Sequence, residues 1–150
     1  MPTKPRPCRT APLLALLALV LPLASGCGVF DDPGFIAYSV GEVGFRDILV
    51  ARADGTERTV VAGSSSDDFN PVWSPDRTRV AFLSDRDGNI EVYISPADGS
   101  SVMRVTKTGV DESQPTWSPD GDRMAYVSGD ENGSPHIFWV SLDDLIPNEL

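Results

Sequence analysis

The sequence has little of the residues that most enzymes use at their active sites. Its 150 residues include one histidine, His136, and two cysteines, Cys8 and Cys27. No Ser-His-Asp set can be assembled with confidence, no Gly-x-Ser-x-Gly elbow is present, and a zinc site needs more ligands than these. No glycine-rich, phosphate-binding loop occurs either. We therefore expect no catalytic residues, no metal, no cofactor and no enzymatic activity.

Only the segment Asp85-Arg86-Asp87-Gly88-Asn89 approaches a calcium-binding loop. Its glycine is misplaced for such a loop, and the distal glutamate is missing. The segment therefore predicts a solvated hairpin turn rather than a metal site.

Basic residues are also scarce. The chain has 12 Lys and Arg against 22 Asp and Glu, a formal net charge of −10 at pH 7. Three of the basic residues, Lys4, Arg6 and Arg9, precede the first acidic residue, so the part after residue 26 is more acidic still. Nucleic-acid phosphates need a basic patch, so we expect no nucleic-acid partner. The acidity is that of a soluble domain kept from aggregating by its charge.

The first 26 residues have the pattern of a signal peptide. Met1–Thr10 is basic, and Ala11–Ala24 is an apolar run shorter than the roughly 20 residues of a membrane span. Small residues then precede Cys27. This arrangement resembles the lipobox of a bacterial lipoprotein precursor, although Ala24 stands where leucine is usual. The resemblance implies that Cys27 becomes the new N-terminus and that its thiol receives a diacylglyceryl group.

Two alternatives remain open: a plain secretory signal that leaves Cys27 as a free thiol, and an uncleaved signal anchor. The cysteine count favours lipidation, because removal of the leader also removes Cys8 and leaves one cysteine. We expect a signal peptide at 1–26, a lipidated N-terminus and short tether at 27–34, and repeats at 35–150. The residue after Cys27 is Gly28 and not Asp. An Asp at this position resembles an inner-membrane retention signal in some bacteria, so its absence slightly favours the outer membrane.

A repeat organises the rest of the chain. Trp73-Ser74-Pro75-Asp76 returns as Trp117-Ser118-Pro119-Asp120, 44 positions later. Fixed-period similarity of this kind indicates a repeat architecture. Proline presets the first corner of the turn and Asp can bond nearby amides, while Trp supplies a large apolar plate between sheets. We therefore interpret Trp73, Pro75, Asp76, Trp117, Pro119 and Asp120 as structural residues.

Short apolar runs with turn residues between them predict an all-β fold of about ten strands. Asp54-Gly55 predicts a tight hairpin in which both residues have positive φ. Runs such as Val92–Ile94 are apolar throughout, which fits sheets covered on both faces. The predicted strands are 35–38, 47–51, 59–62, 71–73, 80–84, 91–95, 102–106, 116–117, 124–128 and 137–141.

The motif and its surroundings resemble the TolB-like, WD-repeat-like β-propeller repeat. Residues 112–128 follow that pattern almost throughout, and residues 68–84 depart from it where Arg77 replaces the usual glycine. The resemblance covers about Phe35 to Asp144. It implies four-stranded blades, about six in a closed ring, of which this chain has about two and a half.

Four polar residues are the candidates for interaction. Asp68, Asn70, Glu112 and Gln114 occupy matching positions before each Pro-x-Trp, where the resemblance places loops around a propeller's axial opening. The alternative is that they cap local turns.

These features favour a non-enzymatic cell-envelope lipoprotein whose blades bind or scaffold an envelope protein. The alternative is a truncated fragment of a larger propeller protein, such as the non-catalytic propeller of a prolyl-oligopeptidase-like enzyme. An unclosed arc leaves strand edges free, so we also expect self-association through the open edges.

Lipidation makes a direct prediction about membrane attachment. Several acyl chains, at about 0.8 kcal/mol per buried methylene, anchor a protein stably. Cys27→Ser should therefore move the protein from the membrane fraction to the soluble fraction, measured by fractionation and immunoblotting. Continued membrane retention of the variant would contradict lipidation at this residue.

Overall fold

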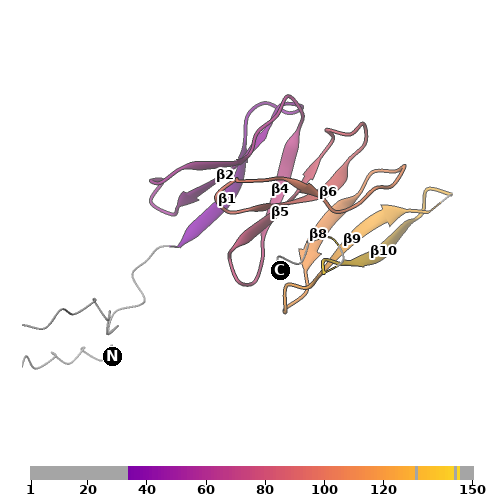
Figure 1. Cartoon of the computed structure of the whole chain (residues 1–150). Coiled ribbons are helices and arrows are strands. Elements are labelled where there is room, and N and C mark those ends of the chain that lie inside the picture. Colours follow the sequence, from indigo (N-terminus) through magenta and orange to yellow (C-terminus); the bar gives the residue numbers. More distant parts are fainter. Residues whose placement is uncertain (1–33, 131, 144, 146–150) are drawn as a thin grey trace, which may run out of the picture. The chain divides into compact units, whose positions relative to one another are not determined.

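The computed structural model describes residues 34–130, 132–143 and 145, which form an all-β structure (Figure 1). They belong to one compact unit, Asp32–Leu150. The signal peptide, Cys27 and the tether up to residue 33 lie outside the described residues. Within the described part, no helix has the length and hydropathy that a membrane span requires. Its strands are β1 (Phe35–Val40), β2 (Asp47–Arg52), β3 (Thr59–Ala62), β4 (Asp68–Trp73), β5 (Arg79–Ser84), β6 (Glu91–Pro96), β7 (Met103–Arg104), β8 (Ser113–Trp117), β9 (Arg123–Gly129) and β10 (Pro135–Ser141).

The strands form three antiparallel sheets, which we call blades. Blade 1 is β1-β2-β3, blade 2 is β4-β5-β6-β7, and blade 3 is β8-β9-β10. Each blade follows chain order, and successive strands are joined by short turns. One four-stranded and two three-stranded blades confirm the predicted partial propeller.

Strand β7 is shorter than predicted, because the sequence indicates a strand over 102–106 and only Met103–Arg104 is one. The amides of Val105 and Thr106 both point to the same carbonyl, that of Val92, at 2.8 and 3.4 Å. Two residues that face one partner interrupt the regular ladder. The strand therefore ends at Arg104.

The central strands of blade 2 are apolar on both faces because a neighbouring blade covers each face. In β5, Val80 and Phe82 face blade 1, whereas Ala81 and Leu83 face blade 3, and all four are buried. Full burial of one such large side chain contributes about 1.5–3 kcal/mol. The core cluster at the first junction is Ile48, Val50, Val61, Ala62, Val80, Phe82 and Tyr93. The cluster at the second is Ala81, Leu83, Val92, Ile94, Val105, Met124 and Leu142.

Stacked aromatic pairs recur at the same place in blades 2 and 3. Phe82 lies opposite Tyr93 in the β5–β6 register, with ring centroids 5.8 Å apart. Tyr126 lies opposite Phe138 in the β9–β10 register, with centroids 6.0 Å apart. Cross-strand aromatic pairs of this kind stabilise a sheet by roughly 0.5–1.5 kcal/mol beyond area burial. The repeat therefore extends to side-chain packing.

One turn geometry closes most of the hairpins in the described residues. The fourth residue of the turn has positive φ and donates its amide to the carbonyl of the first; these residues are Gly55, Arg77, Gly88, Gly99, Gly121 and Gly133. The prediction that Asp54 also has positive φ is wrong: the chain uses a four-residue turn that needs a left-handed conformation only at its end. Arg77 adopts that conformation (φ 58°) despite its side chain, so the departure from glycine leaves the turn unchanged.

The Ser-Pro-Asp motif closes a hairpin through its serine. Ser74 Oγ donates to Asp76 Oδ1 (2.6 Å) and accepts from the amide of Arg79 (3.0 Å). These bonds hold the two strand ends together across the turn. The hydrogen bond from Ser74, then that from the Thr78 amide, lowers the pKa of Asp76 to about 2. The same contacts recur among Ser118, Asp120 and Arg123.

The proline and tryptophan of each motif have distinct positions. Pro75 and Pro119 lie in the turns, and both are exposed. Trp73 packs against the first core cluster and Trp117 against the second. The guanidinium of Arg79 lies 4.8 Å from the Trp117 ring centroid, a cation–π contact that joins blade 2 to blade 3.

Gly99 makes a testable contact between blades 1 and 2. A Cβ added there would lie 2.4 Å from the carbonyl oxygen of Val60, a backbone atom of β3. Gly88 has positive φ too, but a Cβ there would meet no atom within 4 Å. Gly88→Ala should therefore cost only the conformational strain, about 1–2 kcal/mol. Gly99→Ala should lower the free energy of unfolding by at least about 1 kcal/mol more, because overpacking is added. Urea unfolding of both variants measures the difference, and equal losses would contradict this contact.

Candidate interaction site on the inner strands

The first strands of blades 2 and 3, β4 and β8, lie next to each other. Trp117 Nε1, on β8, donates to the carbonyl of Val72 on β4 at 3.1 Å. Trp73 Nε1 is buried as well, but it finds no acceptor among the residues that the structure describes. Blade 1 has no described strand in the place that β4 takes beside β8, which accounts for the missing acceptor.

Both inner strands carry a β-bulge at the same repeat position. The pairing register shifts between Phe69 and Val72 in β4, and between Ser113 and Thr116 in β8. Asn70 (φ 58°) and Gln114 (φ 53°) take the left-handed conformation there. Asn tolerates this conformation better than most residues, whereas Gln holds it at a cost of about 1–2 kcal/mol. Neither bulge was predicted from the sequence. In both strands, however, a residue with an amide side chain directly precedes a proline, and this pair marks the position of the bulge.

The bulges present two amide side chains to solvent. Asn70 and Gln114 are both exposed. Neither side chain makes a hydrogen bond to any residue that the structure describes. Since they lie on adjacent strands at equivalent positions, the structure brings them to one face of the inner strands. These two of the four predicted site residues are therefore exposed side by side on the inner strands.

Asp68, by contrast, is fully buried and paired with a cation. Arg86 Nη2 donates to both of its carboxylate oxygens, at 2.9 and 3.0 Å. The same guanidinium lies 4.9 Å from the Tyr93 ring centroid, and its Nε donates to Ser84 Oγ. Asp68 therefore holds the β5–β6 turn to the start of β4, and no ligand reaches its carboxylate.

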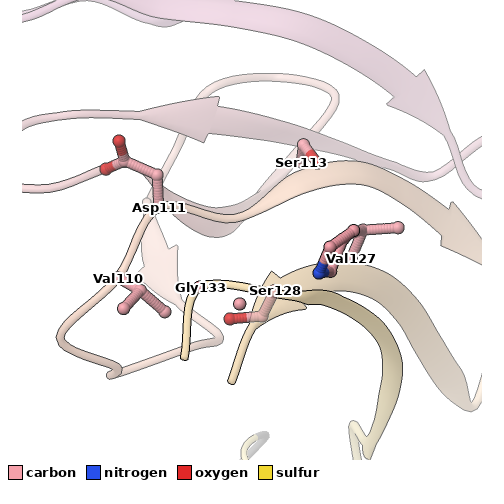
Figure 2. A pocket seen from close by; sticks show the side chains of 8 residues that line it. Val110, Asp111, Ser113, Val127, Ser128 and Gly133 are labelled. Atoms are coloured by element: carbon pink, nitrogen blue, oxygen red, sulfur yellow. The ribbon is translucent and has the colours of Figure 1, made fainter. Parts of the chain in front are cut away.

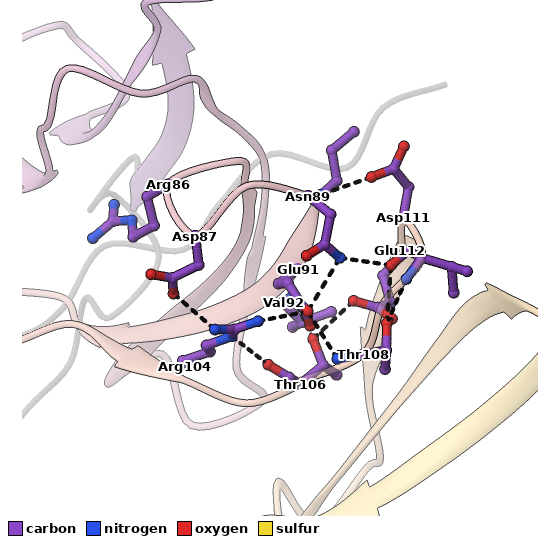
Figure 3. A network of polar contacts seen from close by, with 12 residues as sticks. Arg86, Asp87, Asn89, Glu91, Val92, Arg104, Thr106, Thr108, Asp111 and Glu112 are labelled. Atoms are coloured by element: carbon purple, nitrogen blue, oxygen red, sulfur yellow. Dashed lines mark hydrogen bonds and ion pairs between the residues drawn. The ribbon is translucent and has the colours of Figure 1, made fainter.

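Glu112 takes the position of Asp68 in the next blade, but no arginine pairs with it. Position 130, which corresponds to Arg86, is an aspartate. Three hydroxyl groups donate to the Glu112 carboxyl instead. Those of Thr106 and Thr108 lie at 3.0 and 2.5 Å (Figure 3), and that of Ser128 lies at 3.2 Å. Burial raises the pKa of Glu112, and a hydrogen bond to Glu91 raises it further. Burial without a paired cation favours the protonated form of a carboxyl.

Glu91, the first residue of β6, is the partner of Glu112. Its Oε1 accepts from Arg104 (2.7 Å), the Thr108 amide (2.8 Å) and Asn89 (3.1 Å) (Figure 3). Burial acts to raise the pKa of Glu91, but the neighbouring polar groups, among them Thr106, Glu112 and Arg104, outweigh it and lower the pKa to about 2. Its Oε2 is buried without a donor from any other described side chain or amide. We infer that a proton on Glu112 supplies that donor.

The opposite pKa shifts of Glu91 and Glu112 point to an acid–carboxylate pair at the blade 2–blade 3 junction. Both side chains are sealed from solvent, with relative exposures of 0% and 2%. Proton sharing of this kind serves catalysis where substrate can reach it. Here no substrate can reach either carboxyl, so the pair joins the two blades. Glu112 was a candidate from the sequence, but Glu91 was not. The hydrogen-bond donors to Glu91 lie up to 17 residues away in the chain, so no local pattern reveals them.

A hollow of about 300 Å³ lies beside this junction (Figure 2). Its single carboxylate, Asp111, accepts a hydrogen bond from the Ile90 amide at 2.8 Å. That bond ties the carboxylate to the backbone of blade 2. The residues lining the hollow are Val110, Asp111, Ser113, Val127, Ser128, Gly129, Gly133 and Pro135.

Of the two remaining segments singled out in the sequence, Asp85–Asn89 can be placed and Cys27 cannot. Among the residues described, no three His, Cys, Asp or Glu side chains are gathered as a metal site requires. The Asp85–Asn89 segment is a hairpin turn in which Gly88 N donates to Asp85 O at 3.0 Å. Cys27, the predicted lipidation site, lies outside the described residues.

The two buried acids should respond differently to amide substitution. Asp68→Asn leaves Arg86 without its carboxylate and should cost about 3–5 kcal/mol. Glu112→Gln keeps a hydrogen-bond donor for Glu91, so its free energy of unfolding at pH 7 should stay within about 1 kcal/mol of the wild type. Urea unfolding of both variants measures this. Equal losses would contradict a protonated Glu112.

The pH dependence gives a second measurement on the same variants. Because the folded pKa of Glu112 is raised above the ordinary 4.5, the folded state holds a proton that the unfolded state releases. Wild-type stability should therefore fall, relative to Glu112→Gln, as the pH rises from 4.5 through the raised pKa. A constant difference between about pH 4.5 and about pH 8 would contradict the shift.

Comparison with known proteins identifies the fold family. The family described as the TolB beta propeller domain matches residues 31–147. A protein TolB homolog from Chlorobium luteolum is 40% identical over 70 residues, which are 43% of this chain and 16% of that protein. The crystal structure of TolB from Acinetobacter baumannii has a TM-score of 0.65 at 25% identity, covering 77% of this chain and 30% of that one.

A putative TolB from Agrobacterium tumefaciens is similar to the same degree, with a TM-score of 0.64 at 25% identity over 73% of this chain and 42% of that chain. This chain thus spans less than half the length of each of these relatives. The family match nevertheless covers most of its residues. The chain belongs to the TolB β-propeller domain family.

Proposed function

We propose that the protein is a non-enzymatic cell-envelope lipoprotein whose TolB-like blades act as a protein-binding or scaffolding module. The observation that most directly supports this proposal is the pair of exposed side-chain amides, Asn70 and Gln114, on adjacent inner strands. An amide offers two donors and an acceptor, so two of them in parallel suit the backbone or side chains of a polypeptide.

The backbone strain at these positions supports a binding role. Left-handed residues other than glycine cost free energy and persist at places where the surroundings hold them, often at functional sites. Packing does not account for these two side chains, because both are exposed and contact no described hydrogen-bond partner. Their repetition in two blades gives a surface that can extend along the inner strands.

The cell-envelope part of the proposal rests on the N-terminus and on the family. The leader with Cys27 predicts export and a lipid anchor, with the outer membrane as the expected location. The family is that of TolB, and the resemblance to it implies a periplasmic component of envelope complexes. A membrane-tethered binding module is consistent with both.

The second candidate is that this chain is one part of a larger propeller protein. It is favoured by the small share of each relative that the chain covers, at most 42% among those compared above. Determining the genomic sequence beyond the codon of Leu150 separates the two. An open frame that continues into more blades and a hydrolase domain would favour the propeller of a peptidase-like enzyme over the scaffold.

Photo-crosslinking in living cells tests the binding module. A photoreactive residue at Asn70 or Gln114 should capture the same discrete envelope protein, identified by mass spectrometry. The matched control is Glu57, which is also exposed and also has positive φ (51°), but lies just before blade 1's outer strand. An Asn70→Ala/Gln114→Ala double variant should then lose co-purification of that protein by at least about tenfold, the equivalent of 1.4 kcal/mol. Equal capture from position 57, or undiminished co-purification, would contradict the proposal.

A further inference from the structure

Two apolar sheet faces of the described structure are uncovered. On blade 3, the face turned away from blade 2 carries Ile137 and Trp139, exposed by 80% and 65%. Ala125 and Val127 lie opposite these residues on β9. We call this the trailing face. On blade 1, the face turned away from blade 2 carries Ile36 and Val40, each 47% exposed.

We call the blade 1 surface the leading face; Tyr38 and, opposite it on β2, Leu49 complete it. Adjacent residues of a strand point to opposite sides, so Ala37, which packs on the first core cluster, places Ile36 and Tyr38 on the outer side. Both faces lie at the ends of the row of blades (Figure 1).

The internal junctions show what covers a trailing face. In blade 2, Ala81 and Leu83 lie opposite Ile94 and Val92 on β6, and all four are buried against blade 3. By register these positions are Ala125, Val127, Trp139 and Ile137 in blade 3. The positions buried at one junction are therefore those left open at the end of the row.

The internal junctions also show what covers a leading face. The residues that blade 3 turns towards blade 2 include Met124 and Tyr126, and those of blade 2 towards blade 1 are Val80, Phe82 and Tyr93. The corresponding blade 1 positions, 44 residues earlier, are Ile36, Tyr38 and Leu49. This chain thus carries one uncovered example of each half of its own blade–blade junction.

We propose that two copies of this chain associate head to tail, with the trailing face of one copy seated on the leading face of the next. We choose a second copy as the occupant because of the repeat. Within the chain, the positions that correspond to the trailing face pack on the side of the next blade that corresponds to the leading face. The leading face supplies that surface. Such an interface is heterologous, joining different surfaces of the two copies, so it closes into a ring or continues as a chain of copies. It differs from strand pairing at the sheet edges, because side chains of stacked sheets make the contact.

Cysteine crosslinking of the full chain in cells tests the proposal. Val92 and Met124 belong to the same internal cluster, and their counterparts across the proposed interface are Ile137 and Ile36. Ile36→Cys and Ile137→Cys, co-expressed with different tags, should form a disulfide-linked heterodimer under oxidising conditions. Val43→Cys, 84% exposed in the β1–β2 loop, replaces Ile36→Cys as the matched control.

The expected result is at least about tenfold more heterodimer from the 36/137 pair than from the 43/137 pair, since disulfides form only between closely spaced Cα atoms. Neither 36 nor 137 should crosslink to itself, and the chain without an added cysteine reports any background from Cys8 or Cys27. Equal yields from both pairs would overturn the proposal. Efficient 137–137 crosslinks would show a symmetric contact instead, and capture of a different protein by position 137 would show a foreign occupant; either result also overturns it.

As a second measurement, Ile137→Asp should abolish the crosslink between position 36 and a cysteine at Val127, a neighbour on the trailing face. The side chain of Ile137 is exposed, so the substitution leaves the fold intact, as circular dichroism will check. If the crosslink between positions 36 and 127 forms as well with Ile137→Asp as without it, the apolar contact is contradicted.

Discussion

Every part of this fold depends on one constraint: a sheet that is apolar on both faces must be covered on both. In blade 2 the constraint is met, since one face of β5 and β6 packs on blade 1 and the other on blade 3. Alternating side chains along one strand therefore belong to different core clusters. The end blades follow the same pattern, but each has only one face covered within the described chain. Because the end blades repeat the pattern of blade 2, their outer faces are apolar as well.

The same junction position is stabilised in two different ways. A carboxyl at the start of the repeat is buried at both junctions, and a buried charge requires a cation or a proton. At Asp68 the chain supplies Arg86. At Glu112 the position that corresponds to Arg86 is Asp130; three hydroxyl groups donate to the acid instead, and burial raises its pKa. Two changes in the 44-residue frame, Asp68 to Glu112 and Arg86 to Asp130, thus accompany the replacement of an ion pair by two neighbouring buried carboxyls.

The repeat made most of the fold predictable, because its apolar runs and turn residues are local features. The strands formed near the expected residues, and the Trp-Ser-Pro-Asp segments form equivalent turns. The early end of β7 was not predictable, since it depends on two amides that share the Val92 carbonyl. Neither was the partnership of Glu91 and Glu112, which depends on side chains brought together by a bulged outer strand and the loop that follows it.

A repeated residue in such a protein ordinarily has a repeated packing role, as the tryptophans, serines and aromatic pairs have here. Asn70 and Gln114 are different: their position repeats, their strained backbone repeats, yet their side chains contact no described partner. The bulge alone does not require an amide, because glycine meets the same φ without strain. The structure thus gives these two amides no packing role among the described residues, and the proposal that they bind a partner starts from that difference.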